Sequence, residues 1–409
     1  MIAALSIAEL GRTLPGGAAP AILDQRIDAG DAGWDADPAG VIHAKHQTLM
    51  RAYQSRYVLL PTEGFNGSIL AHLDRHHDPT EMTRLDGLRP GLEQELIAPQ
   101  ARAALQAHAQ AGAGADVARY AEALLGELRG GEENPFTVVL RGQPARAHHY
   151  RDFLLQSSAD LLAEASASAL GVVGAFGAPQ SALFRILIDE FGYGAHGRKH
   201  SVLFQAVMRD FGLADEYNAY WPLFDTAALE LHNAIHYLFQ NPRNIFLQVG
   251  FLLFAETAYQ RSTADHFRYL RQFHPDADAR YFGEHAHIDL HHTRMVIDDV
   301  IAPLVASYGA EVGAEIVAGA EFTRAAFARA GAHLLTVAQA FAAAVDAGEA
   351  AYGLPSTLAA GRGLTPGAAA MCERPVRLQV GGLGTVSATA FAGFPAGAFG
   401  RIVSPEDRP

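Results

Sequence analysis

This chain of 409 residues has little sulfur and little charge. It contains one cysteine, Cys372, and six methionines. A single cysteine excludes an intrachain disulfide framework and a zinc site built on several cysteines, and it favours a reducing compartment such as the cytoplasm. Charged residues make up 18% of the chain and hydrophobic residues 49%, a balance typical of a globular protein with a large core.

Long apolar runs and basic patches are also missing. No apolar run reaches the roughly 18 residues that span a bilayer, so we expect no membrane partner. The opening MIAALSIAELGRTLPGG has no basic start and is interrupted by Glu9, unlike a signal peptide. The formal net charge of −13 argues against nucleic acid as a partner. We therefore expect a small-molecule substrate.

Composition divides the chain into three parts. Residues 1–146 predict a mostly helical part, with one β-like run at Phe136–Leu140, and we expect it to form a homodimer. Residues 147–347 show helical periodicity without a strand pattern, which predicts a helical bundle. Residues 348–409 are rich in Gly, Pro and Ala, with two candidate strands at Val376–Val380 and Thr385–Ala390.

Two finer features of the bundle follow from the local pattern. His148–Leu170 is amphipathic over its length, which predicts one long helix. Ile245–Gln260 is strongly apolar and predicts a buried helix. Ser262 or Thr263 can cap the start of a separate helix after it.

Histidine is abundant, with 19 residues concentrated between positions 196 and 292. His285, Asp289 and His292 stand at i, i+4 and i+7, so they share one face of a predicted helix. Two imidazoles and a carboxylate on one face suit Fe, Mn or Zn. His291 and Asp298 fall on other faces. The alternative for this stretch alone is a polar surface helix.

Three glutamates interrupt helices that are otherwise apolar. They are Glu164 in LLAEASASALGVV, Glu190 in ALFRILIDEFGYG and Glu256 in FLQVGFLLFAETAY. Each alone would fit a helix boundary, because burying an unpaired carboxylate costs several kcal/mol. Together with the His/Asp face they predict a metal centre that neutralises their charge.

His200 is the natural companion of Glu190. Gly192 and Gly194 lie between them, where a helix break would turn His200 inward. His196 is the competing candidate. Four carboxylates and three imidazoles exceed what a single non-haem Fe(II) needs, and they suit two irons with a bridging carboxylate.

The run from Glu164 to Phe204 resembles the haem-oxygenase-like diiron oxidase family, also called the iron-containing redox enzymes. In that family a second glutamate follows the first after 26 residues and a histidine follows ten residues later, as at Glu164, Glu190 and His200. A later glutamate and an H-x3-D-x2-H helix complete the family's set. Glu256, His285, Asp289 and His292 occupy those places, and the resemblance covers about residues 147–347.

The resemblance implies an all-α fold: a seven-helix haem-oxygenase-like bundle with an N-terminal helical extension and a short irregular or β tail. It implies two Fe(II) ions, O2 as co-substrate, and scope for an external electron donor. By analogy, Glu164, His200 and His292 would bind one iron. His285, Asp289 and Glu256 would bind the other, and Glu190 would bridge.

The expected reaction is N-oxygenation of a small amine or amino-acid-derived metabolite in a biosynthetic pathway. Family members that hydroxylate a guanidine nitrogen in nitrosourea biosynthesis carry an N-terminal helical dimerisation domain and a C-terminal cupin. The present tail is too short for that cupin and has no histidine after His333, which puts a cupin-type second step in doubt.

Several alternatives stay open at this point. The same diiron site would also suit oxidative C–C cleavage or desaturation of an amino or fatty acid. A haem-degrading enzyme or a non-enzymatic helical protein would leave the buried acids unexplained. A ferritin-like iron carrier requires two E-x-x-H motifs, and only Glu284–His287 offers one.

Overall fold

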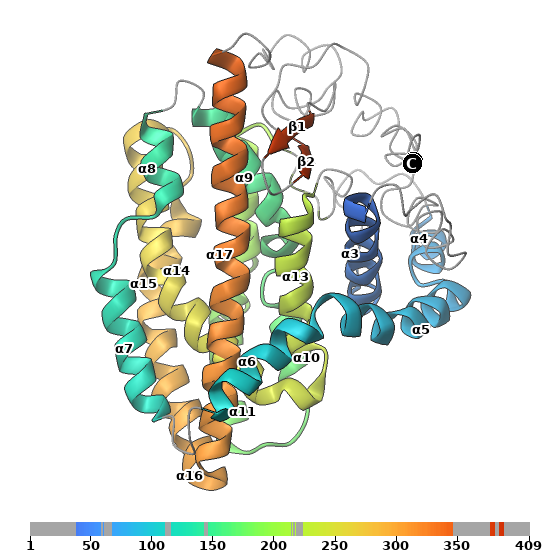
Figure 1. The fold of residues 1–409 in the computed structure, drawn as a ribbon, viewed down its shortest axis with the longest axis vertical. Coiled ribbons are helices and arrows are strands. Elements are labelled where there is room, and N and C mark those ends of the chain that lie inside the picture. The colour runs from blue at the N-terminus through green and yellow to red at the C-terminus, as the bar shows by residue number, and fades with distance from the viewer. Residues whose placement is uncertain are drawn as a thin grey trace.

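The computed structural model describes residues 38–346, except 59, 61–67, 111–115, 143–145, 214, 216 and 218–223, together with residues 377–380 and 384–387. Within these residues the chain is helical apart from one small hairpin, as Figure 1 shows. The predicted all-α class is therefore confirmed. The rest of the predicted tail lies outside the described residues.

The bundle is built on three long helices that stand side by side (Figure 1). They are α14 (Ile245–Phe273), α15 (Arg280–Met295) and α17 (Ala310–Asp346). Further helices complete it: α9 (Arg146–Leu161), α10 (Ser166–Gly171), α11 (Ala178–Glu190), α12 (His200–Asp210), α13 (Thr226–Phe239), η5 (Pro242–Asn244) and α16 (Ala302–Tyr308).

In the part of the chain that the structure describes, six helices precede the bundle: α3 (Pro38–Gln54), α4 (Ile69–His76), α5 (Pro79–Leu96), α6 (Ala98–Gln110), α7 (Val117–Gly130) and α8 (Pro135–Arg141). Helix α6 crosses α17, and α7 packs on α14 (Figure 1). Leu96 and Leu124 belong to the same buried cluster as Leu253 and Ile316. These helices thus share the core of the bundle, and their role in a homodimer stays a prediction.

The predicted β-like run Phe136–Leu140 is wrong, because these residues form most of α8. The Asn134 side chain accepts a hydrogen bond from the Phe136 N–H, and Pro135 occupies the first turn. Both features favour the start of a helix. Phe136 and Leu140, four residues apart, are buried together. A short apolar run cannot by its periodicity distinguish a strand from a buried helix.

Two helix boundaries also differ from the prediction. The expected helix His148–Leu170 ends at Leu161 and resumes at Ser166, with Ala165 in the left-handed region at φ 65°. Helix α14 instead continues through Thr263, where we expected a new helix to begin. The Thr263 hydroxyl donates to the carbonyl of Tyr259, four residues earlier, so it does not cap a helix.

The two candidate strands of the tail do form. They are β1 (Arg377–Val380) and β2 (Gly384–Ser387), paired antiparallel with Arg377 opposite Ser387. The first predicted strand began one residue before β1. The second predicted strand began one residue after the start of β2 and extended beyond its end.

Helices α14 and α17 cross with their backbones in contact. A Cβ at Gly250 would lie 2.0 Å from the Ile316 carbonyl oxygen, and one at Gly319 would lie 2.2 Å from the Leu247 carbonyl oxygen. Only glycine fits at such a contact. The crossing fixes the position of α14, which also carries Glu256.

A second buried cluster of hydrophobic side chains, which includes Tyr150, Tyr269 and Phe282, encloses a histidine. The His266 ring is stacked between Phe153 and Phe282, with centroid distances of 4.5 and 5.1 Å. Its Nδ1 lies 3.1 Å from the Tyr150 hydroxyl. Burial lowers the pKa of His266 to about 3, so this ring is neutral in the folded protein at neutral pH.

The glycine crossing can be tested by G250A and G319A. We expect each substitution to lower the free energy of unfolding by about 1–3 kcal/mol, because the added methyl group forces the two backbones apart. Denaturant unfolding measures the change. Gly331, also on α17, has open space around it, so G331A should be neutral or stabilising by up to ~1 kcal/mol. Equal effects at all three positions would contradict the contact.

His266 should also shape the acid stability of the protein. Because its folded pKa is depressed below the unfolded value of 6.5, the unfolded chain takes up the proton first. The contribution is complete above pH 6.5 and is lost as pH falls toward 3. Between pH 7 and 5, wild type should lose about 2 kcal/mol more stability than H266F.

Urea unfolding at several pH values measures this difference. H196Q, at an exposed histidine, is the control and should keep the pH dependence of wild type. Parallel stability curves for wild type and H266F would show that His266 carries no such linkage.

Candidate metal centre

Helix α15 presents the predicted His/Asp face to the interior. His285, Asp289 and His292 have exposed fractions of 3%, 0% and 0%, whereas His291 is exposed. The helix then widens into a π-helical segment, η6 (Val296–Ile301), before α16. Pro303 stands in the first turn of α16 and lacks an N–H, which disfavours regular α-helical bonding to the preceding turn.

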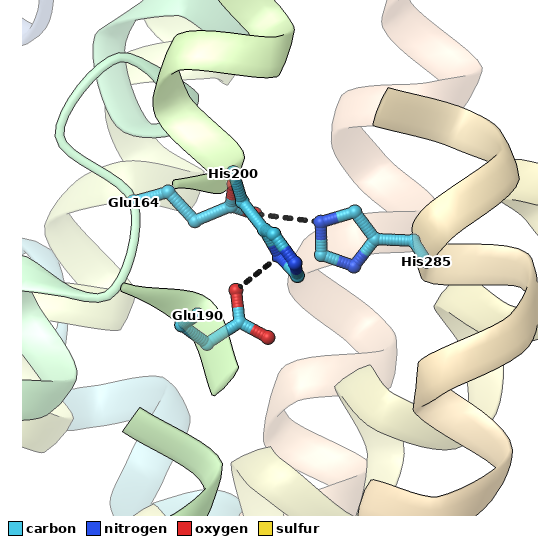
Figure 2. A group of neighbouring side chains, drawn as sticks. All are labelled: Glu164, Glu190, His200 and His285. Atoms are coloured by element: carbon cyan, nitrogen blue, oxygen red, sulfur yellow. Dashed lines mark ion pairs between the residues drawn. The ribbon is translucent and has the colours of Figure 1, made fainter. Parts of the chain in front are cut away.

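Glu190 and His200 come from either side of a break in the helix. Glu190 ends α11, His200 begins α12, and two 3-10 turns separate them: η2 (Gly192–Gly194) and η3 (His196–Arg198). A Cβ at Gly192 would lie 2.5 Å from the Arg198 carbonyl carbon. This tight return brings His200 Nδ1 to 2.6 Å from Glu190 Oε2 (Figure 2). The competing candidate His196 is exposed and lies outside the cluster.

Glu164 lies in another break in the helices, between α9 and α10. Its Oε1 accepts a hydrogen bond of 2.8 Å from the Tyr281 hydroxyl and lies 3.4 Å from His285 Nε2 (Figure 2). The adjacent Ala165 adopts a positive φ that costs a non-glycine residue energy. The turn that places Glu164 is therefore held by its surroundings.

His292 is surrounded by carboxylates. Its Nδ1 lies 3.2 Å from Glu256 Oε2, 3.6 Å from Glu190 Oε1 and 3.8 Å from Asp289 Oδ1. Its Nε2 lies 3.1 Å from Oδ2 of Asp189. The sequence prediction missed Asp189, although it directly precedes Glu190 at the end of the same apolar helix.

All seven predicted residues thus lie close together, and six of them form two overlapping groups. In the first group, Glu164, Glu190, His200 and His285 offer atoms that all lie within 4.8 Å of one another. In the second, Glu190, Asp289 and His292 do the same. Glu256 contacts the second group through His292. Glu190 belongs to both groups. The two histidines of α15 differ from the predicted division, because His285 lies in the group of Glu164 and His292 in that of Asp289.

The carboxylates hold positive charge on the imidazoles. Burial opposes protonation of His292, but Glu256, Glu190 and Asp289 outweigh it and raise the pKa of this ring to about 10. Asp289 and Glu164 likewise raise the pKa of His285 against the effect of burial. Burial raises the pKa of Asp289 to about 7, although His285 opposes the shift.

The donor set fits iron. Glu164 Oε2 and Asp289 Oδ2 are buried and accept no hydrogen bond from any described residue. Buried carboxylate oxygens normally have a partner, and a cation would supply it. Carboxylate oxygens with imidazole nitrogens form the usual ligand set of non-haem iron. The site therefore has both the donor atoms and the unsatisfied negative charge that such an ion requires.

A cavity of about 750 Å³, including space open to solvent, adjoins the cluster. Glu164, Glu190, Glu256 and His285 line one part of it, and Leu183, Ile186, Phe251 and other apolar side chains line the rest. Asp160, which the sequence prediction also missed, lines the cavity; burial and Glu164 raise its pKa to about 7. A small molecule bound here would lie next to the clustered ligands.

Among the described helices, none is both long and apolar enough to cross a lipid bilayer.

Residues 151–328 match the sequence model of a family described as iron-containing redox enzyme. Nitrosourea synthase from Streptomyces achromogenes subsp. streptozoticus is 33% identical over 284 residues, which cover 68% of this chain. The match spans 58% of that relative's length. All seven clustered residues lie inside residues 151–328. Residues 151–328 are thus similar to the family of iron-containing redox enzymes, as the resemblance of the sequence predicted.

Proposed function

We propose that this chain is a non-haem diiron oxidoreductase that uses O2 to oxidise a small amine or amino-acid-derived metabolite in natural-product biosynthesis. The observation that carries the proposal is the position of Glu190, which is shared by two buried groups of carboxylates and imidazoles. One ion would not require two such groups. The family match supports iron as the metal.

The proposed ligand division follows the observed groups. Glu164, His200 and His285 would hold one iron, Asp289, His292 and Glu256 the other, and Glu190 would bridge them. Bound iron would supply the redox chemistry with O2 that no side chain provides. Tyr281 fixes the Glu164 carboxylate through its hydroxyl. The haem-oxygenase-like order of the bundle helices is part of this proposal.

The cavity next to the ligand cluster is the proposed binding site of the substrate. Apolar walls exclude water and hold a small molecule against the ligand cluster, which limits side reactions. The half-buried Asp160 carboxylate lines this cavity, where it would accept a hydrogen bond from an N–H group of an amine. The walls and Asp160 would together orient the nitrogen toward the metals.

N-oxygenation is the reaction that we favour over C–C cleavage or desaturation. The support comes from the relative: the name nitrosourea synthase denotes a product with an oxidised nitrogen. A homodimer formed through the N-terminal helices, a cytoplasmic location and an external electron donor belong to the same proposal.

Anaerobic titration with Fe(II) tests the metal centre. Metal-free wild-type protein should bind two irons per chain, measured by equilibrium dialysis and metal analysis. E190A should weaken both sites, because Glu190 belongs to both groups. E284Q is the matched control: it changes an exposed glutamate on α15 next to His285, and it should still bind two irons. Wild-type protein that binds one iron or none would refute the diiron centre.

Turnover with isotopically labelled O2 tests the reaction class. We expect the iron-loaded protein to consume O2 with an amine substrate and to place one labelled oxygen atom on nitrogen, detected by mass spectrometry. D289A should reduce this product to background, since Asp289 Oδ2 lies within the ligand cluster. Carbon–carbon fragments would indicate cleavage instead, and an unlabelled product lacking two hydrogens would indicate desaturation.

A further inference from the structure

Asp189 lies on the opposite side of His292 from the clustered ligands. Three predicted ligands, Glu256, Glu190 and Asp289, face Nδ1 of the ring. Asp189 Oδ2 faces Nε2 at 3.1 Å. The Asp189 side chain is only 15% exposed and the His292 side chain is fully buried. Asp189 belongs to neither group of residues that could hold a metal ion.

This geometry determines which ring nitrogen can bind a metal. A neutral imidazole carries one proton, and the other nitrogen is free to bind a cation. An ionised carboxylate only accepts hydrogen bonds, so Asp189 retains the proton on Nε2. A metal would then take the place of the proton on Nδ1, which faces Glu190, Asp289 and Glu256.

The loop after α11 interacts with Asp189. Tyr193 follows in this loop, and the Asp189 carboxylate raises the pKa of its hydroxyl. Tyr193 has a left-handed backbone, with φ 54°, between two glycines of positive φ. Such a conformation is costly for a tyrosine and is retained where the surrounding contacts require it.

We propose that Asp189 is a positioning residue: it accepts a hydrogen bond from Nε2–H of His292 and thereby turns Nδ1 toward the metal. The inference rests on the proposed diiron centre. It extends that centre by a residue whose role is to orient a ligand, an arrangement in which a carboxylate, an imidazole and a metal lie in series.

Metal affinity tests the role of Asp189. Metal-free wild type, D189A and D189N are titrated with Co(II) in a calorimeter, and the visible spectrum of bound Co(II) is recorded. We expect D189A to bind the ion held by His292 about 10–100-fold less tightly than wild type does, with a changed visible band of bound Co(II). D189N should restore much of the affinity and the band, because its amide oxygen can still accept from Nε2–H.

Two controls separate this role from general effects. E284Q removes a negative charge near Tyr193 without a described contact to His292, and it should bind Co(II) like wild type. The melting temperature of each metal-free variant should stay close to that of wild type, because the predicted effect acts on the ligand and not on the fold.

The outcomes distinguish this inference from the function on which it rests. Unchanged affinity and spectrum in D189A would overturn the positioning role while leaving the diiron centre intact. Loss of one whole ion in both D189A and D189N would also overturn it, because Asp189 would then be a ligand itself. Wild-type protein that binds no metal would instead refute the proposed function.

Discussion

The rest of the structure depends on one constraint: four carboxylates and three imidazoles lie together inside an apolar helical bundle. An isolated carboxylate there would cost several kcal/mol, so these groups are stable only with positive charge close by. His292 shows the strength of this constraint, because its pKa reaches about 10 although the ring is fully buried. The orphaned oxygens of Glu164 and Asp289 show that hydrogen-bond donors from the described residues alone do not satisfy it.

The bundle meets this constraint at places where its helices depart from regular geometry. Glu164 lies in the turn between α9 and α10, and Glu190 and His200 lie on either side of a second break. Helix ends and turns can present side chains in directions that a continuous helix cannot. The regular helices α14 and α15 provide the opposite wall, and the glycine crossing of α14 and α17 holds it in place. Rigid helices and irregular turns together make the ligand cluster.

Much of the candidate site was predictable because its residues conflict with their local sequence. Glu190 and Glu256 are charged residues in apolar helices, and the i, i+4, i+7 spacing of His285, Asp289 and His292 needs only helical periodicity to be recognised. Asp189 carries no such signal, since an acid beside a predicted ligand at a helix end is equally compatible with a solvated residue. The helix α8 was missed for a related reason: a run of five residues, four of them apolar, is too short to reveal its period.

The sequence by itself determined the helical class and the residues that cluster, because burial of charge and periodic spacing are properties of the chain's own order. It also carried the resemblance to the iron-containing redox enzymes. Only the tertiary structure decided how the residues are grouped. His285 lies with Glu164 and His200, and His292 lies with Asp289 and Glu256, because the breaks around Ala165 and Gly192 set the direction of each ligand. Which nitrogen of His292 faces the ligands was decided in the same way. It depends on side chains from three helices, whose distances in space no local pattern encodes.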